Sequence, residues 1–185
     1  DPQSLVYASR MSAKVDSAAV QDGYQLYHHV MFFDREGRWA VVQQGMNGEN
    51  RYARRYHWLG LEKVNFVCEP HQAVCCDQRG EILNLVAREG EENRKVSAAL
   101  TAEEPERLIR EYRRIETLEL PRRHSVTPEE VRSGYLSRIL VETYERRPEN
   151  FEALLGIPGV GAKTLRSLSL LAELLYGAKP SFRDP

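Results

Sequence analysis

Residues 26–44, LYHHVMFFDREGRWAVVQQ, decide the fold. Two runs of apolar and aromatic residues lie on either side of the turn-forming sequence DREG (34–37), and this order predicts a β-hairpin. Because successive side chains of a strand point to opposite faces, only one of the neighbours His28 and His29 can face a given site. This hairpin is the clearest strand prediction in the chain.

The sequences around the hairpin extend it to an α+β domain. Residues 4–21 repeat apolar side chains at intervals of mostly three and four, which predicts an amphipathic helix. Short strands are predicted at 65–68 and 82–86, and a helix at 105–114 within the charged stretch that follows. We therefore predict an N-terminal α+β domain over residues 1–120.

The C-terminal part, residues 121–185, is predicted to be an all-helical domain. Thr127 followed by Pro128 is typical of an N-cap and a first helical position. Gly177 is expected to end the last helix. The predicted helices of this domain are 128–144, 150–155 and 162–176. The predicted fold class is α+β, with the helical domain built around a helix-hairpin-helix.

The sequence IPGVGAKT (157–164) lies between the last two predicted helices. Its two glycines have no β-carbon, so a phosphate can approach the backbone amides at the N-terminus of the following helix. The alternative is a plain turn between two packed helices. We expect the hairpin to hold a nucleic-acid backbone. The residues predicted to contact it are Gly159, Val160, Gly161, Lys163 and Thr164, with Arg166 and Lys179 as further cations.

This segment resembles the hairpin of the helix-hairpin-helix DNA glycosylases. In the bifunctional members of that family a lysine at the position of Lys163 is the nucleophile, so the resemblance implies Lys163 as a catalytic residue. Those enzymes also use an aspartate after the second helix, where Asp184 falls here, but in the different setting FRDP. A lysine amine attacks only when unprotonated, which requires a desolvated or cation-crowded site. The alternative role for Lys163 is a simple phosphate contact.

A second group of candidates lies in RYARRYHW (51–58), which interleaves arginines with aromatic residues. Guanidinium groups neutralise phosphates and aromatic rings stack on bases, so this pattern favours a nucleic-acid surface. The predicted contacts are Arg51, Arg54 and Arg55. The alternative is a solvated basic loop that Tyr56 and Trp58 anchor to the core.

Polar residues in the N-terminal domain could also form a catalytic centre. Asp16, Asp22, His28 or His29, and Gln44 offer acid-base or metal-binding groups, although no spacing fixes their arrangement. We name Asp22 and His29 as the catalytic candidates. The paired glutamines Gln43 and Gln44 can equally satisfy buried backbone groups or read base edges.

The cysteines are crowded into a short segment. Cys68, Cys75 and Cys76, with His71, offer four candidate zinc ligands, but they lack the paired Cys-x-x-Cys knuckles of a structural zinc site. We therefore expect buried thiols and no metal. Three cysteines within nine residues also argue against a disulfide framework, which favours a reducing, cytoplasmic location.

The overall composition limits the kinds of partner. A net charge of −1 gives no global attraction to nucleic acid, so such a partner must be held by local patches. The longest apolar stretch, 165–176, is interrupted by polar and charged residues and is shorter than the roughly 20 residues that span a bilayer. We see no secretory signal and expect no membrane association.

Several stretches together resemble the prokaryotic family catalogued as domain of unknown function 763. They are 21–29, 40–47, 51–58, 69–71, 91–95 and 148–185, so the resemblance covers nearly the whole chain. Members of that family are longer at both ends, which implies that this chain is a piece of a longer protein. The resemblance implies no particular activity.

The expected function is nucleic-acid binding in DNA repair or processing, with DNA as the partner and RNA as an alternative. Whether the protein is an enzyme stays open, and the sequence identifies no cofactor. The enzymatic alternative is a glycosylase-lyase or a nuclease. The non-enzymatic alternative is an interaction module whose hairpin packs on a protein partner.

Overall fold

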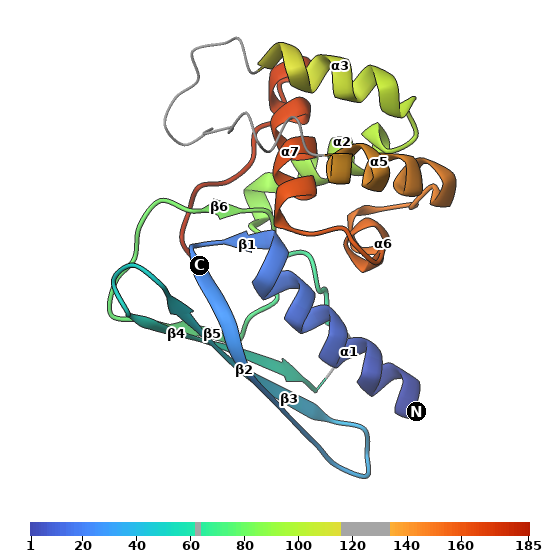
Figure 1. Ribbon diagram of the computed structural model, residues 1–185. Helices are drawn as coiled ribbons and strands as arrows, with labels where there is room; N and C mark the ends of the chain where they lie inside the picture. The colour runs from blue at the N-terminus through green and yellow to red at the C-terminus, as the bar shows by residue number, and fades with distance from the viewer. Residues whose placement is uncertain (62–63, 116–133) are drawn as a thin grey trace. The chain divides into compact units, whose positions relative to one another are not determined.

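The computed structural model describes residues 1–61, 64–115 and 134–185 (Figure 1). The chain forms two units, Asp1–Glu91 with Ser181–Pro185, and Glu92–Pro180. Antiparallel sheets in the N-terminal region are followed by a region of several helices, which confirms the predicted α+β class. The predicted boundary at residue 120 and the predicted helix start at Thr127 lie outside the described residues.

The first unit begins with α1 (Pro2–Lys14), as the apolar spacing predicts. Asp1 caps this helix by accepting a hydrogen bond from the Gln3 amide, and a proline in the first turn suits a position where no amide partner is needed. The helix continues into a π-helical turn, Val15–Ala19, four of whose five residues are buried. This turn carries Asp16 into the interior.

The predicted hairpin is confirmed as β2 (Tyr24–Phe33) and β3 (Trp39–Asn47). Asp34 orders the turn by accepting hydrogen bonds from two backbone amides in the 34–38 segment. Strands β4 (Ala53–Gly60) and β5 (Ala73–Cys75) complete an antiparallel sheet in the order β2-β3-β4-β5. Most of the arginine-rich segment 51–58 is therefore strand β4. Neither the nucleic-acid surface nor the solvated loop considered from the sequence specified a strand.

The two faces of this sheet differ in character. The inner face carries buried side chains, namely Val41, Gln43, Arg54, Tyr56 and Trp58, and strand β3 contacts α1. On the outer face, the strand register aligns His28, Gln44, Arg55 and Cys75 in one row, and Val42, His57 and Ala73 in the next. None of the four strands contains an aspartate or a glutamate.

A smaller sheet joins distant parts of the first unit. Strand β1 (Val20–Gln21) pairs with β6 (Leu83–Asn84), and Asn84 also forms a β-bridge with Ser181. The predicted strand at 82–86 is thus shorter than expected. The strand predicted at 65–68 is wrong, because these residues form a turn in which the Asn65 side chain accepts a hydrogen bond from the Val67 amide.

The second unit is helical, as predicted for the C-terminal part. Its helices are α2 (Glu91–Leu100, beginning at the last residue of the first unit), α3 (Pro105–Ile115), α5 (Gly134–Arg146), α6 (Phe151–Gly156) and α7 (Ala162–Tyr176). Asn150 caps α6, and Gly177, in the left-handed region, ends α7 as expected. Helix α7 supplies much of the core through Leu165, Leu168 and Leu171, each at most 1% exposed. Among the described residues, no helix has the length and apolar character needed to cross a membrane.

Candidate functional site

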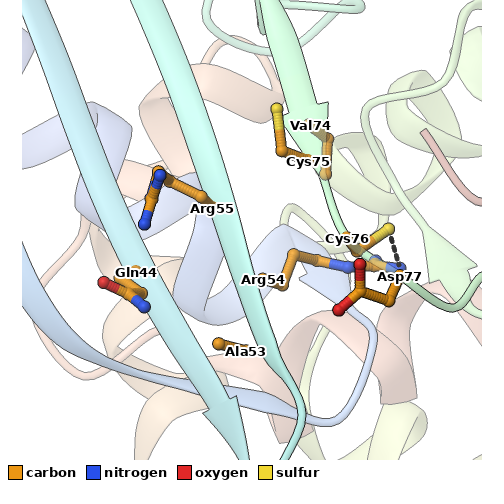
Figure 2. A pocket seen from close by; sticks show the side chains of 8 residues that line it. All are labelled: Gln44, Ala53, Arg54, Arg55, Val74, Cys75, Cys76 and Asp77. Atoms are coloured by element: carbon orange, nitrogen blue, oxygen red, sulfur yellow. Dashed lines mark hydrogen bonds between the residues drawn. The ribbon is translucent and has the colours of Figure 1, made fainter.

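A buried ion-pair cluster lies in the first unit around Arg54, which is 1% exposed. Its guanidinium donates to Asp22 Oδ2 at 3.0 Å and to Asp184 Oδ2 at 2.7 Å. It also contacts the Cys76 thiol, a contact drawn in Figure 2. Burial opposes the charge on Arg54, but the two carboxylates outweigh it and raise the arginine's pKa. The cluster therefore holds two ionisable carboxyl groups around one permanent cation.

Asp22 is one of the two carboxyl groups of this cluster. Burial raises its pKa, although hydrogen bonds from the Tyr56 hydroxyl, at 2.6 Å, and from the Tyr24 amide favour the charged form. Burial and the nearby Asp22 also raise the pKa of Tyr56. A carboxyl with a raised pKa is a candidate general acid or base, so the predicted role of Asp22 remains a prediction.

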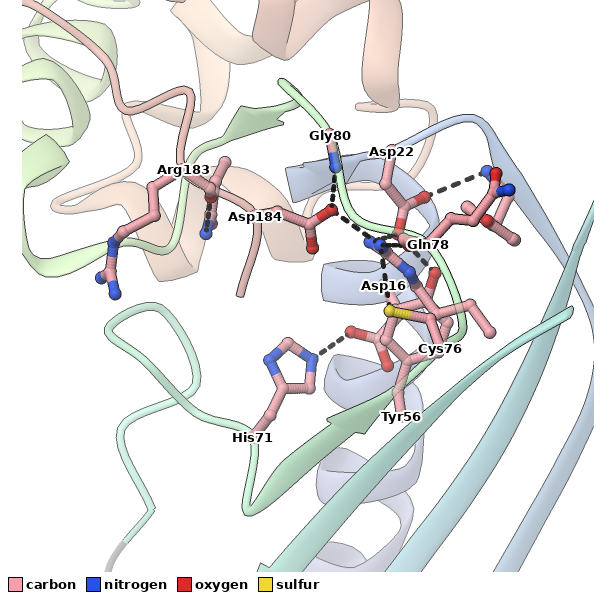
Figure 3. Close-up of polar contacts among 12 residues, drawn as sticks. Asp16, Asp22, Tyr56, His71, Cys76, Gln78, Gly80, Arg183 and Asp184 are labelled. Carbon is pink, nitrogen blue, oxygen red and sulfur yellow. Dashed lines mark hydrogen bonds and ion pairs between the residues drawn. The ribbon is translucent and has the colours of Figure 1, made fainter. Parts of the chain in front are cut away.

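Asp16 organises a second network beneath the sheet. Its carboxylate, 0% exposed, accepts hydrogen bonds from Gln43 Nε2, from Trp58 Nε1 at 2.9 Å and from His71 Nε2. Figure 3 shows the His71 ring directed at Asp16. Gln43 in turn accepts from His29 Nδ1 at 2.8 Å, and His29 Nε2 contacts the Ser9 hydroxyl. Asp16 thus links two histidines.

The residues predicted to form one catalytic centre lie in different parts of the first unit. His29 is joined to Asp16 through Gln43, while His28 and Gln44 lie in the outer row of the sheet. Among the hydrogen bonds of the described residues, Asp22 and His29 belong to separate networks. Sequence reasoning missed Gln43 as the link. The available signal was strand alternation, which places it on the same face as the apolar Val41.

The three predicted arginine contacts have different environments. Arg54 points inward, and its guanidinium pairs with the carboxylates of Asp22 and Asp184. Arg55 is exposed on the outer face. Arg51 is exposed in the turn between β3 and β4, with a φ of 63°. Strand alternation, which separates Arg54 from Arg55, explains the difference.

Two of the cavities among the described residues open on the first unit. The larger, about 420 Å³, is shown in Figure 2 and is lined by Gln44, Ala53, Arg54, Arg55, Val74, Cys75, Cys76 and Asp77. The smaller, about 290 Å³, is lined by residues that include Glu69, His71 and Arg183. The larger cavity is lined by the cation of Arg55 and also by the carboxylate of Asp77, so it can receive a polar group.

The cysteines do not match the expectation of buried thiols. Cys75 is exposed, Cys68 and Cys76 are half-buried, and all three are free. His71 uses its Nε2 for Asp16. Within the ranges that the structure describes, no group of three or more His, Cys, Asp or Glu side chains is arranged to hold a metal ion.

The turn between α6 and α7 lies where the hairpin was predicted. Gly159 has a φ of +84°, and its carbonyl accepts a hydrogen bond from the Tyr135 hydroxyl of α5. A β-carbon at this position would lie 2.6 Å from Ile139 Cδ1. Val160 is 0% exposed. Gly159 and the Val160 side chain therefore fix the turn against its neighbours, and the Val160 amide donates to the Ile157 carbonyl at 3.2 Å.

Gly161 and Lys163 occupy the start of α7. Gly161 is the N-cap, with extended backbone, no side-chain capping hydrogen bond, and open space where a β-carbon would be. Lys163 is exposed, so it lacks the desolvated setting that a lysine nucleophile needs. Thr164 is buried, and Asp184 is engaged by Arg54 in the first unit. Lys179 lies beyond the other end of α7.

The last segment of the chain is tied to the first unit by a surface ion-pair network. Arg183 donates to Glu89 and Glu69, and Ser181 also donates to Glu89. The hydrogen bonds from Arg183, and then that from Ser181, lower the pKa of Glu89 from 4.5 to about 2.

This network predicts an acid-sensitive contribution to stability. A carboxylate whose pKa is lower in the folded state stabilises the fold above its unfolded pKa, and this contribution is lost as the pH falls through the folded value. We expect the free energy of unfolding to decrease between about pH 4.5 and about pH 2. Glu89→Gln should flatten this dependence, measured by urea denaturation at several pH values. The effect is small because the Glu89 side chain is 49% exposed. Glu49→Gln, at another exposed position, should leave the slope unchanged, and equal slopes in both variants and the parent would contradict the assignment.

Comparison with known proteins identifies the family. The chain belongs to the family described as "Protein of unknown function (DUF763)", whose family model matches residues 1–185, and the resemblance seen in the sequence is confirmed. No curated protein and no solved structure matches the chain. The resemblance of 157–164 to the hairpin of DNA glycosylases therefore stands on those residues alone.

Proposed function

We propose that this protein binds nucleic acid, with DNA as the first candidate partner, in DNA repair or processing. The observation that carries the proposal is the start of α7, where Gly161 leaves the first helical turn without a side-chain cap and open to an approaching group. Exposed backbone amides at a helix N-terminus bind phosphate oxygens. The α6–α7 turn is proposed to hold the backbone, without reading the base sequence.

The electrostatics of this turn favour an anion. The N-terminus of a helix carries roughly half a positive charge, and the first turn of α7 contains no acidic residue to occupy it. Lys163 adds an exposed ammonium in that turn. Among the described residues, the buried Thr164 Oγ1 in the same turn has no hydrogen-bond partner. A phosphate would therefore meet positive potential and no competing carboxylate of that turn.

The outer face of the four-stranded sheet supports the same function. Arg55, His28 and His57 lie on it, and strands β2 to β5 contain no carboxylate. The 420 Å³ cavity opens beside Arg55, and Arg51 lies at the end of the sheet. Because the net charge of the chain is −1, such local surfaces must supply the attraction. We propose this face as a second nucleic-acid contact.

The proposal predicts a binding defect in two variants of the α6–α7 turn. Gly161→Val should block the approach to the amides, and Lys163→Glu should reverse the local charge. We expect each to weaken binding to a labelled DNA duplex by about tenfold or more at low salt, since one lost phosphate contact corresponds to about 1–2 kcal/mol. Fluorescence anisotropy at two salt concentrations measures this, and wild-type affinity should fall steeply with salt.

A matched charge variant controls for the general effect of net charge. Lys179, which the sequence also offers as a phosphate contact, lies beyond the far end of the 15-residue α7, about 20 Å from Lys163 along the helix, so Lys179→Glu makes the same charge change away from the α6–α7 turn. Its affinity should stay within about twofold of the wild-type value. Equal losses for Lys163→Glu and Lys179→Glu would contradict a localised site. Salt-insensitive behaviour with no affinity for DNA or RNA would favour the protein-interaction alternative.

A further inference from the structure

We propose that Ser9 and His29 form a nucleophile-base pair for acyl transfer, an activity separate from nucleic-acid binding. Ser9, half-buried, lies on α1, and His29, exposed, lies on the adjoining strand β2. The Ser9 hydroxyl is 2.9 Å from His29 Nε2. A serine hydroxyl within hydrogen-bond reach of an imidazole is the first requirement for nucleophilic catalysis.

The surrounding hydrogen bonds determine which nitrogen of His29 carries the proton. Both hydrogens of Gln43 Nε2 are directed to acceptors, the Ser12 carbonyl at 3.1 Å and the Asp16 carboxylate. Gln43 Oε1 must therefore accept from His29 Nδ1, 2.8 Å away. Neutral His29 then has a lone pair on Nε2, to which the Ser9 hydroxyl donates. This is the protonation state that a general base requires.

The orienting group is itself fixed. Turning the Gln43 amide over would place its carbonyl oxygen against the Asp16 carboxylate, where two acceptors would face each other. Asp16 cannot easily turn away, because Trp58 and His71 also donate to it. Ser9, His29 and Gln43 therefore correspond to the nucleophile, the base and the orienting group of a catalytic triad. The third member here is an amide and not a carboxylate.

The surroundings of the pair indicate an uncharged acyl ester as the substrate class. Val6 lies one helical turn before Ser9 and is 68% exposed, and Met31 lies two residues after His29 on the same side of its strand. Neither α1 nor β2 contains an aspartate or glutamate that would repel a carboxylate product. A short acyl chain can contact the apolar side chains while its carbonyl carbon lies at Ser9.

The proposed reaction balances without a cofactor. Ser9 Oγ forms a bond to the ester carbonyl carbon while its proton moves to His29 Nε2. The carbon-oxygen bond to the alcohol then breaks, and the alcohol oxygen takes that proton. Water next attacks the acyl-serine and gives a proton to His29 Nε2, the bond to Oγ breaks, and Oγ regains the proton as the carboxylic acid leaves.

The test uses two probes on the same chain, a fluorophosphonate reagent and p-nitrophenyl acetate. We expect one fluorophosphonate adduct per chain, mapped to Ser9 by peptide mass spectrometry, and burst release of nitrophenol. Ser9→Ala should abolish both. His29→Ala should slow labelling by about 100-fold or more, the usual contribution of a general base, and added imidazole should partly restore it. Ser4→Ala is the control, because Ser4 is an exposed serine of the same helix whose hydroxyl donates to the Asp1 carbonyl.

A separate measurement tests the positioning role of Gln43. The ¹⁵N chemical shifts of the His29 ring distinguish the two neutral tautomers and should report a proton on Nδ1. Gln43→Met should remove this preference and slow labelling, with folding checked by circular dichroism. Labelling that is unchanged in Ser9→Ala, or no adduct after prolonged treatment with excess probe, would overturn the proposal. DNA binding by the Ser9 and His29 variants should equal that of the wild type, so this result and that of the proposed function are independent.

Discussion

Arg54→Met is expected to lower the free energy of unfolding by about 3–5 kcal/mol, because it leaves buried carboxylates without their cation. Asp22 and Asp184 both pair with this guanidinium, and their side chains are 1% and 6% exposed. Methionine fills a similar volume, so the decrease in the free energy of unfolding reports mainly the uncompensated charge of the two carboxylates. Urea denaturation followed by tryptophan fluorescence is the appropriate measurement, since both tryptophans, Trp39 and Trp58, belong to the first unit.

The neighbouring residue provides the control for this experiment. Arg55→Met makes the same chemical change one position later on β4, where the side chain is exposed. Its free energy of unfolding should stay within about 0.5 kcal/mol of the wild type. Similar losses for the two variants would show that the Arg54 ion pairs do not stabilise the unit as the geometry indicates.

Gly159→Ala should destabilise the second unit by about 2–5 kcal/mol, the sum of two costs. A non-glycine residue in the left-handed region costs about 1–2 kcal/mol, and the φ of Gly159 is +84°. The new methyl group would also lie 2.6 Å from Ile139 Cδ1, an overlap that costs about 1–3 kcal/mol when a packed core must adjust. Thermal unfolding followed by circular dichroism of the helices measures the loss.

Gly161→Ala is the matched control, because its β-carbon meets no atom within 4 Å and its φ of −131° suits any residue. We expect a change of less than about 1 kcal/mol. A larger loss at Gly161 than at Gly159 would contradict the geometry of the turn. The comparison also guides the binding assay, since reduced DNA binding by a Gly159 variant could arise from unfolding alone, whereas Gly161 isolates the contact.

Local sequence patterns were sufficient to predict most helices and the hairpin. Apolar spacing located α1, and Gly177 located the end of α7. These features depend on side chains a few residues apart, which a single sequence displays directly. Helix α2 was missed because its apolar residues are few, and it is held instead by Asn93, which donates to two backbone carbonyls of its own unit.

The polar networks could not be predicted because they join distant residues. Asp16 meets His71, 55 residues later, only because the π-helical turn buries it beneath the sheet. Arg54 and Arg55 are chemically identical in the sequence and acquire opposite environments from the strand register. The candidate residues were therefore recognisable by type, while their partners required the tertiary structure.

The pairing of Arg54 with Asp184 also has a consequence for the order of events during synthesis. The two residues are 130 positions apart, and the whole second unit is encoded between them. At translation rates of 5–20 residues per second, Arg54 leaves the ribosome on the order of 10 s before its second carboxylate. The first unit cannot be completed until its last segment, Ser181–Pro185, has been synthesised. The second unit is contiguous in sequence and is synthesised before that segment, so it can fold first.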